Sequence, residues 1–318
     1  MNPIAVTCGD PAGIGPEICA KAWCHLRDRI PMVYVGDADH LPGDIPHFQW
    51  QPGHSLRTDR LAVYPIAFQG ALRRGTPCLN MAQGTIDAIA AAVTLVQQRA
   101  AQAVTTAPIH KKTLQEGAGF EFPGHTEFLA HLASADDVVM MLACPELRVV
   151  PTTIHIPLSN VPQTLTASLL RRTINITHRA LQQDFGIASP RLRVAGLDPH
   201  AGEGGNIGTI DRDMIAPVVA ERARYMDITG PVSADTLFHA GARAAYDAAI
   251  CMYHDQALIP IKTIDFDHGV NVTLGLPFVR TSPDHGTAHD IAGQDRASPT
   301  SMIAAIELAA DMGARRGD

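Results

Sequence analysis

Short apolar runs alternate with helical patterns through the first third of the chain. Between the apolar runs, the spacing of apolar residues predicts helices over Ile18–Arg27 and Ile86–Gln98. Strands that alternate with helices are typical of parallel sheets with right-handed crossovers. The runs that we predict as strands are Ile4–Cys8, Met32–Val35, Leu61–Ala67 and Ala103–Thr106.

The middle of the chain has a different pattern. Val138–Cys144 and Leu147–Ile154 are apolar runs separated only by Pro145-Glu146, which predicts a hairpin and therefore a mixed sheet. Further strands are expected at Arg191–Leu197, Ala249–Tyr253 and Gly269–Arg280, the last bent near Gly275 and Pro277. Helices are expected at Leu165–Asp184, Thr209–Arg224 and Ser301–Met312.

These elements predict an α/β protein with two domains that share the chain without a flexible tether. We expect residues 118–260 to form an inserted domain, and residues 1–117 plus 261–318 to form the other. With 318 residues, 46% of them hydrophobic and 18% charged, the chain can bury a sizeable core.

Composition narrows the class of partner. The net charge of −7 argues against non-specific nucleic-acid binding, and only 5% of the residues are aromatic, which disfavours base stacking. No apolar run approaches the roughly 18 residues that span a membrane. The six cysteines show no CxxC spacing and lie mostly in apolar or helical patterns, so we expect reduced thiols and a cytoplasmic protein.

Three histidines follow predicted strands. His155, His200 and His254 each stand at or near the carboxyl end of an apolar run, where open α/β sheets place their ligand sites. Three imidazoles can bind Zn²⁺ or a similar divalent ion and leave a position open for substrate. Asp198 and Asp255 could orient the neighbouring imidazoles. Three unrelated histidines at strand ends remain an equal alternative, because their spacing forms no local motif.

A second group of residues suits an anionic ligand. Lys262, Asn271 and Arg280 combine a lysine, an amide and a guanidinium, which bind phosphate or carboxylate well. Lys262 could also serve as a general acid or base. Thr126 could cap a helix over 127–132 and point its free N–H groups at a ligand, with His125 beside it. A solvated face and an ordinary helix cap are the alternatives.

Glycine-rich segments give no nucleotide fingerprint. Gly13-Ile14-Gly15 follows the first strand, but Ile18 stands where a G-x-G-x-x-G motif needs its third glycine. The segment 202–208 does not fit that motif either, and no P-loop is present. A bound dinucleotide would therefore require another binding device.

Long motifs give the chain a family resemblance. They are GDPAGIGPE (9–17), HTEF (125–128), TTIHIPL (152–158), DPHAGEGG (198–205), ADTLF (234–238), MYHDQ (252–256) and GVNVTLGLPFVRTSPDHGTAHDIAG (269–293). Together they resemble the family of 4-hydroxythreonine-4-phosphate dehydrogenases of vitamin B6 biosynthesis. The loop His285–Gly293 also resembles the adenine-side loop of isopropylmalate and isocitrate dehydrogenases, which bind NAD or NADP without a Rossmann fold.

The resemblance implies an architecture and a set of site residues. It implies two α/β/α domains with a cleft between them, in a homodimer that shares its metal site between subunits. It makes His155, His200 and His254 the ligands of one divalent metal ion (Zn, Mg or Co). The family's substrate-binding positions correspond to His125, Thr126, Lys262, Asn271 and Arg280, and the cofactor positions to His285, Gly286 and Asp290.

The reaction implied is NAD(P)-dependent oxidation of a small phosphorylated amino acid, 4-phosphooxy-L-threonine, at C3. Loss of CO₂ then gives 3-amino-2-oxopropyl phosphate, with Lys262 as the candidate base. Related dehydrogenases that act on a phosphorylated sugar acid or a cis-dihydrodiol are the first alternative. A metal-dependent lyase or hydrolase, or a catalytically silent metal-binding protein, is the alternative of another class.

Overall fold

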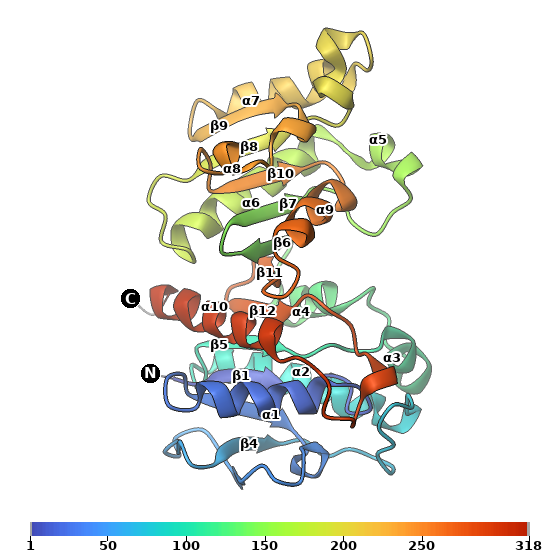
Figure 1. The fold of residues 1–318 in the computed structure, drawn as a ribbon, viewed down its shortest axis with the longest axis vertical. Helices are drawn as coiled ribbons and strands as arrows, with labels where there is room; N and C mark the ends of the chain where they lie inside the picture. Colours follow the sequence, from blue (N-terminus) through green and yellow to red (C-terminus); the bar gives the residue numbers. More distant parts are fainter. Residues whose placement is uncertain (1, 317–318) are drawn as a thin grey trace. The chain divides into compact units, whose positions relative to one another are not determined.

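The computed structural model describes residues 2–316, which divide into two compact units (Figure 1). Unit 1 comprises residues 1–136 and 276–318, and unit 2 comprises residues 137–275. These boundaries differ from the expected ones after residues 117 and 260. Helix α4 (His125–Ala133) packs on α2 (Ala82–Gln97) of unit 1, and β11 (Val270–Leu274) pairs with β6 (Val139–Cys144) of unit 2.

Unit 1 is built on a parallel sheet. Its strand order is β3-β4-β2-β1-β5-β12, and each described pair of neighbours runs parallel. The strands are β1 (Ile4–Thr7), β2 (Met32–Gly36), β3 (His47–Gln49), β4 (Leu61–Pro65), β5 (Ala103–Thr106) and β12 (Val279–Pro283). The central strands are fully buried, as expected for a parallel sheet covered on both faces.

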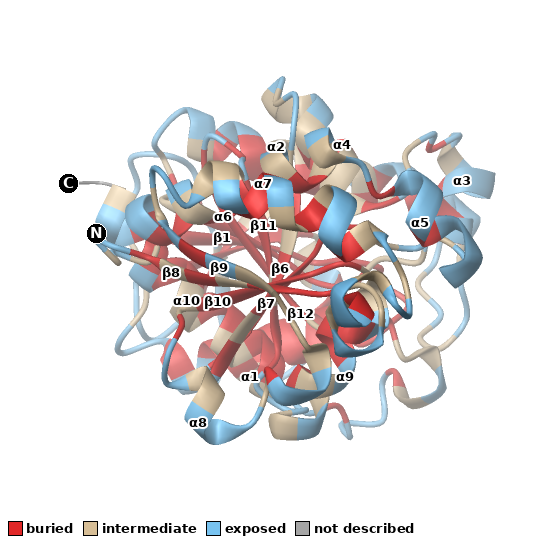
Figure 2. Ribbon diagram, turned by 90° about the horizontal axis from the view of Figure 1, so that it is seen from above, coloured by how far each residue is buried: buried red, intermediate tan, exposed pale blue. Residues whose placement is uncertain are grey.

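Helices cover both faces of the unit 1 sheet (Figure 2). α2 packs on β1, β2 and β5 from one side, with α3 (Lys111–Ala118) and α4 against it. α1 (Gly15–Leu26) and α10 (Thr300–Arg316) pack together on the other side. The order of strand, helix and strand along the chain therefore produces the predicted layered arrangement in this unit.

One helical stretch has the length and hydropathy of a membrane span. Leu79–Gln97 is long and apolar enough to span a membrane by length and composition alone, whereas we expected no such stretch. Half of it, however, is buried inside the structure. It contains η2 (Leu79–Met81) and α2, and α2 covers three strands of the unit 1 sheet. Its apolar surface is therefore explained by its place in the core.

Unit 2 has a mixed sheet with the order β11-β6-β7-β10-β8-β9. The predicted hairpin is confirmed: β6 pairs antiparallel with β7 (Leu147–Pro151), and β11 runs antiparallel to β6. The remaining pairs are parallel and join β7 to β10 (Ala248–Cys251), β10 to β8 (Arg191–Ala195), and β8 to β9 (Asp227–Val232).

Helices also flank the unit 2 sheet on two sides (Figure 2). α9 packs on β6, β7 and β10, where Leu258 and Ile261 join Val149 and Ala249 in an apolar cluster. α6 contacts β6 and β11 and packs on α7. The helices of this unit are α5 (Val161–Thr164), α6 (Ala167–Gln183), α7 (Ala216–Arg222), α8 (Ala240–Arg243) and α9 (His254–Ile264).

One predicted strand is wrong. The chain does not continue as a single strand from Gly269 to Arg280: β11 ends at Leu274, and β12 begins at Val279 in the other unit. Gly275 has a φ of +92°, and a Cβ there would lie 2.6 Å from the Asp137 carbonyl oxygen. The left-handed backbone and this close approach end the strand where only a bend was expected.

Candidate active site

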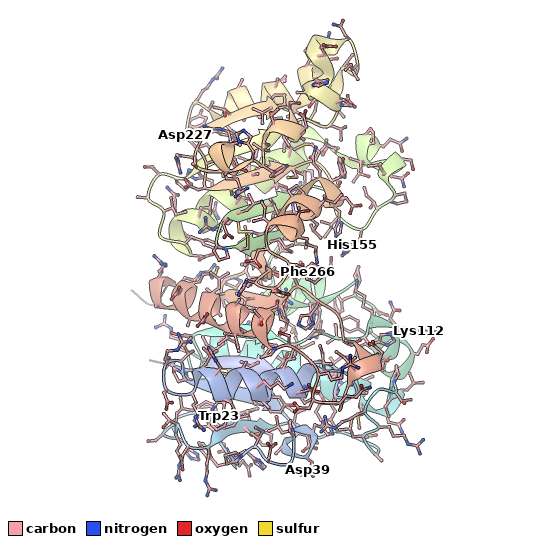
Figure 3. The ribbon with its side chains drawn as sticks, in the orientation of Figure 1. Trp23, Asp39, Lys112, His155, Asp227 and Phe266 are labelled. Atoms are coloured by element: carbon pink, nitrogen blue, oxygen red, sulfur yellow. The ribbon has the colours of Figure 1, made fainter. Side chains whose placement is uncertain are left out.

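The three histidines follow neighbouring strands at one edge of the unit 2 sheet. β10 lies between β7 and β8 and is parallel to both, so their carboxyl ends share that edge. His254 begins α9 directly beyond β10, and His155 and His200 stand in the loops that follow β7 and β8. The rings of His155 and His254 have their centroids 5.5 Å apart (His155 is labelled in Figure 3). His200 is exposed on its own loop.

Two of these histidines have a strained backbone. His155 has a φ of +48° and His200 a φ of +53°, a region that costs a non-glycine residue about 1–2 kcal/mol. The left-handed conformation continues from His200 through Ala201 and Glu203 to Gly204, within the 3₁₀ segment η4 (Pro199–Gly205). Such strain persists where the surrounding structure imposes it, and it is concentrated at functional sites.

Two carboxylates support the histidine loops. The Asp255 Oδ1 atom lies 2.7 Å from the Nδ1 atom of His254, which leaves Nε2 of that ring for a ligand. Asp211 was not predicted as a site residue. It is fully buried, and it accepts hydrogen bonds from the backbone N–H groups of Leu197 (2.8 Å) and Asp198 (3.0 Å). Burial raises the pKa of the Asp211 carboxyl, against the effect of those two donors.

Asp198 does not orient His200 in the way the sequence suggested. Its carboxylate lies against the backbone of Gly208, where a Cβ would stand 1.8 Å from Oδ2. The loop before His200 is fixed by the buried Asp211 instead. No sequence signal marked Asp211, because it stands in a predicted helix among other acidic residues.

Unit 1 brings several cationic or donor groups to the start of α4. Arg280 on β12 is 2% exposed, and its Nη2 atom donates to the Thr106 Oγ1 at the end of β5, 2.6 Å away. Burial lowers the Arg280 pKa to about 10. Burial, with the positive charges of Arg280 and Lys111, holds the pKa of the His125 imidazole well below its usual range. The His125 Nε2 atom is buried without a hydrogen-bond partner.

The capping prediction for this helix is wrong. α4 begins at His125, with Gly124 as the N-cap residue and no side chain capping it, so Thr126 belongs to the first turn. A Cβ at Gly124 would lie only 3.5 Å from the Lys111 Nζ atom, which places that ammonium beside the helix start. Backbone N–H groups and positive charge at a helix N-terminus favour an anion. Lys111 was missed by sequence reasoning because nothing in its local pattern distinguished it.

The other two anion candidates lie in unit 2, so they do not share a strand with Arg280. Asn271 is on β11, and its side-chain Oδ1 is buried without a hydrogen-bond partner. Lys262 is in the last turn of α9, where its Nζ atom lies 5.4 Å from the centroid of the exposed Phe266 ring (Phe266 is labelled in Figure 3). The predicted substrate residues are therefore divided between the two units.

The loop after β12 packs on the loop after β1 within unit 1. The Ile14 N–H donates to the Thr287 carbonyl (3.0 Å), and a Cβ at Gly13 would lie 2.7 Å from that oxygen. The His289 Nε2 lies 3.0 Å from the Asp10 Oδ2. The predicted cofactor residues of this loop, which are His285, Gly286 and Asp290, are exposed.

Comparisons with known proteins identify the same family that the sequence motifs indicated. A sequence model of the family described as "Pyridoxal phosphate biosynthetic protein PdxA" matches residues 28–309. A relative from Roseobacter denitrificans, a 4-hydroxythreonine-4-phosphate dehydrogenase, is 58% identical over 318 residues, covering 98% of each chain. The chain belongs to the PdxA family of 4-hydroxythreonine-4-phosphate dehydrogenases.

Solved structures of PdxA proteins have the same fold. A 4-hydroxythreonine-4-phosphate dehydrogenase from Klebsiella pneumoniae superposes with a TM-score of 0.90 at 36% identity, covering 98% of this chain and all of that one. A terephthalate 1,2-cis-dihydrodiol dehydrogenase from Burkholderia xenovorans gives a TM-score of 0.70 at 28% identity, with 98% of each chain covered. The architecture is therefore shared beyond the PdxA proteins.

The donor set at the histidine edge fits a divalent ion. Three imidazoles are the donor set that a catalytic zinc-type site uses, and the Asp255 contact on Nδ1 leaves the Nε2 atom of His254 for a ligand. Thr153, His155, Tyr253 and His254 line a hollow of about 210 Å³ at this edge. Within one described chain, the three imidazoles do not form a group whose ligand atoms all lie within 4.8 Å of one another.

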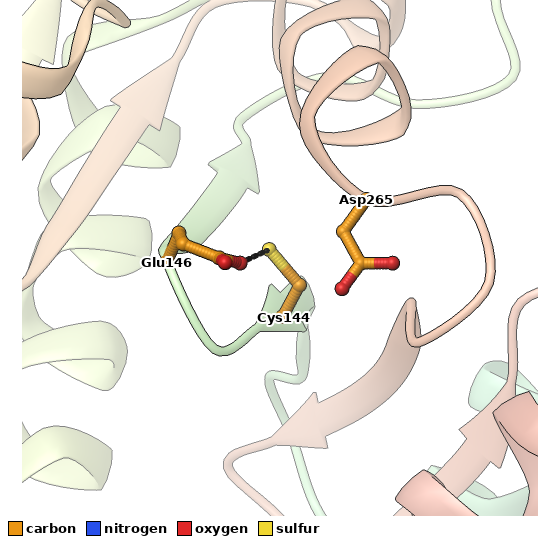
Figure 4. A group of neighbouring side chains, drawn as sticks. All are labelled: Cys144, Glu146 and Asp265. Carbon is orange, nitrogen blue, oxygen red and sulfur yellow. Dashed lines mark hydrogen bonds between the residues drawn. The ribbon is translucent and has the colours of Figure 1, made fainter.

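Another group among residues 2–316 does meet that distance, and it fits a metal poorly (Figure 4). It consists of Cys144, Glu146 and Asp265. Burial raises the pKa of the Cys144 thiol, which disfavours the thiolate that a metal needs. The Asp265 Oδ1 already accepts from the backbone N–H groups of Asp267 and His268, and Asp265 also contacts the His268 ring. Asp265 is the C-cap residue of α9, and Cys144 and Glu146 lie where β6 turns into β7.

Proposed function

We propose that the protein oxidises 4-phosphooxy-L-threonine at C3 with NAD or NADP and one divalent metal ion, followed by decarboxylation to 3-amino-2-oxopropyl phosphate, in the biosynthesis of pyridoxal 5′-phosphate. The observation that carries the proposal is the set of three adjacent parallel strands, each followed by a histidine beyond its carboxyl end. Two of those histidines are held in left-handed backbone. Membership of the PdxA family supplies the substrate class.

The metal site proposed here is His155, His200 and His254, with Zn, Mg or Co as the ion. A bound ion would stabilise negative charge as it develops on the substrate oxygen, and a bound nicotinamide would accept the hydride that leaves C3. Neutral imidazoles leave the ion's charge uncompensated, which strengthens that effect. The Asp255 carboxylate keeps the His254 ring oriented through its 2.7 Å contact.

The chain's own residues bind the substrate and move one proton. We assign the substrate's anionic groups to His125, Thr126, Lys262, Asn271 and Arg280. The buried positive charge of Arg280 and the N–H groups at the start of α4 support an anion there. Lys262 takes the proton of the C3 hydroxyl. The resulting β-keto acid then loses CO₂, and the carbon left behind is protonated.

The cofactor is assigned to unit 1. The loop of His285, Gly286 and Asp290 is exposed, and a Cβ at Gly286 would meet nothing within 4 Å. Its packing on the loop of Gly13 holds it in a fixed conformation for a dinucleotide. We further propose a cytoplasmic homodimer in which the metal site is shared between subunits, because one chain does not gather the three imidazoles closely.

Substrate assays test this function against its nearest alternative. Purified protein with Zn²⁺, Mg²⁺ or Co²⁺ and either NAD⁺ or NADP⁺ is given 4-phosphooxy-L-threonine, and NAD(P)H and CO₂ are measured together. We expect both products in equal amounts. The structural likeness to a cis-dihydrodiol dehydrogenase makes a phosphate-free cis-dihydrodiol carboxylate the comparison substrate. Turnover of that substrate alone would assign the chain to the alternative activity.

The role of Lys262 needs a separate measurement. For Lys262→Met we expect a loss that falls mainly on kcat, because a proton acceptor acts in the transition state. A change confined to KM would instead make Lys262 a binding group for the anion. Lys112 is exposed and pairs with Glu116, so Lys112→Met is the matched control.

A further inference from the structure

The backbone of one buried residue connects the ends of the three strands that precede the histidines. Met252 directly follows β10 and is fully buried. Its N–H donates to the Oε1 atom of Gln256, 2.7 Å away. Its carbonyl oxygen accepts from the Thr153 hydroxyl (2.8 Å) and from the Thr153 N–H (3.2 Å), in the loop after β7.

Gln256 extends this connection to the third strand. Its Nε2 atom donates to the carbonyl oxygen of Gly196, 2.7 Å away, immediately after β8. Gln256 is 9% exposed and Thr153 is 4% exposed, so water competes little for these bonds. The segments that carry His155, His254 and His200 are therefore connected by two side chains through the backbone of Met252.

The side-chain chemistry at position 256 is demanding. Gln256 must accept a hydrogen bond from one backbone group and donate one to another at the same time. A neutral amide does both, whereas a carboxylate can only accept and an apolar side chain does neither. At position 153 only a hydroxyl can donate to the Met252 carbonyl, so serine could replace threonine but valine could not.

We propose that Gln256 and Thr153 are positioning residues for the metal ion, because they fix the strand ends from which this chain presents its histidines, whichever subunit's ion each histidine binds. The inference rests on the proposed metal site. It adds that neither residue is a ligand and that both set the affinity of the ligands. Partners that orient metal ligands typically contribute 10–100-fold to metal affinity. A shift of these strand ends would displace every imidazole that the chain contributes, whether to its own ion or to one shared with its partner.

The test measures Co²⁺ binding to the full-length protein, without substrate or cofactor. Co²⁺ affinity is obtained by competition with a chelating dye, and the visible Co²⁺ spectrum reports the geometry of its ligands. For Gln256→Met and Thr153→Val we expect binding about 10–100-fold weaker and a changed spectrum. Gln256→Glu keeps the bond to Met252 but sets a carboxylate oxygen against the Gly196 carbonyl oxygen, so its affinity should fall as well. Thr153→Ser should restore the wild-type affinity and spectrum.

The neighbouring Thr152 provides a matched control. It is buried to a similar degree, and its hydroxyl has no hydrogen-bond partner, so Thr152→Val removes the same atom without breaking the connection. We expect wild-type Co²⁺ affinity for it. If Gln256→Met fails to fold, as circular dichroism would show, Gln256→Glu and Thr153→Val decide the question.

The outcomes distinguish a failure of this inference from a failure of the proposed metal site on which it rests. If the wild-type protein and His254→Ala bind Co²⁺ equally, the metal site itself is wrong, and the inference is overturned with it. If His254→Ala abolishes binding but Gln256→Met and Thr153→Val behave like Thr152→Val, the metal site stands and the positioning role is refuted. A fall in thermal stability with unchanged affinity and spectrum would likewise refute it.

Discussion

The buried carboxylate of Asp211 should control the stability of the loop that carries His200. The Asp211 side chain is fully buried, and its two oxygens accept from the N–H groups of Leu197 and Asp198 at 2.8 and 3.0 Å. Asp211→Asn preserves the shape but turns one acceptor into a donor that faces a backbone N–H group. One charge-assisted bond is lost and one donor is left unsatisfied, which should cost about 2 kcal/mol or more.

Hydrogen–deuterium exchange of peptides covering residues 196–208 measures this cost locally. A loss of about 2 kcal/mol in the free energy of local opening corresponds to roughly 30-fold faster exchange. Asp213→Asn is the control, because Asp213 is exposed and pairs with the exposed Arg212, so its removal should change little. The reasoning is refuted if Asp211→Asn exchanges no faster than Asp213→Asn.

Three further predictions follow from burial and charge. A thiol reagent should modify Cys24 and Cys78 in the native protein and leave the four buried cysteines intact, and reaction of all six without unfolding would contradict the structure. Arg280→Lys should raise KM for the phosphorylated substrate by about 10–100-fold, because a bidentate donor is lost; an unchanged KM would remove Arg280 from the anion site. Because the pKa of His125 is lowered in the folded protein, its imidazole takes up a proton below about pH 6.5 in the unfolded chain but stays neutral in the folded one. Wild-type stability should therefore fall by about 1 kcal/mol more than that of His125→Asn between about pH 7.5 and 5.5, as urea unfolding would show, and parallel losses would contradict the shift.

Hydrophobic periodicity predicted most of the elements because each strand is short, apolar and bounded by turn residues. β5 has the predicted bounds, and the hairpin of β6 and β7 is found where two residues separate two apolar runs. The prediction of one strand over 269–280 failed because the alternation continues across Gly275, while the chain there passes from unit 2 to unit 1. Hydrophobic periodicity shows which residues face a core, but it does not show whether that core belongs to unit 1 or to unit 2.

The residues of the candidate site were likewise predicted only in part from the sequence. The three histidines could be selected as candidates because strand ends can be read from the sequence, and the observed strand order places all three at one edge of the unit 2 sheet. Asp211, Gln256 and Lys111 were missed because their roles depend on contacts between segments far apart in the chain. The prediction of a Thr126 cap failed because a threonine gives a capping signal in the sequence, but the N-cap residue of α4 lies two residues earlier, at Gly124.

The central claim is that His155, His200 and His254 bind the metal ion on which turnover depends. The most direct measurement is metal content and NAD(P)-dependent turnover of 4-phosphooxy-L-threonine in the same preparation, for each histidine-to-alanine variant. His239, an exposed histidine that caps α8, supplies His239→Ala as the control. We predict that each of the three variants loses both metal and turnover while the control keeps both. Full metal content and full turnover in His200→Ala would contradict the claim.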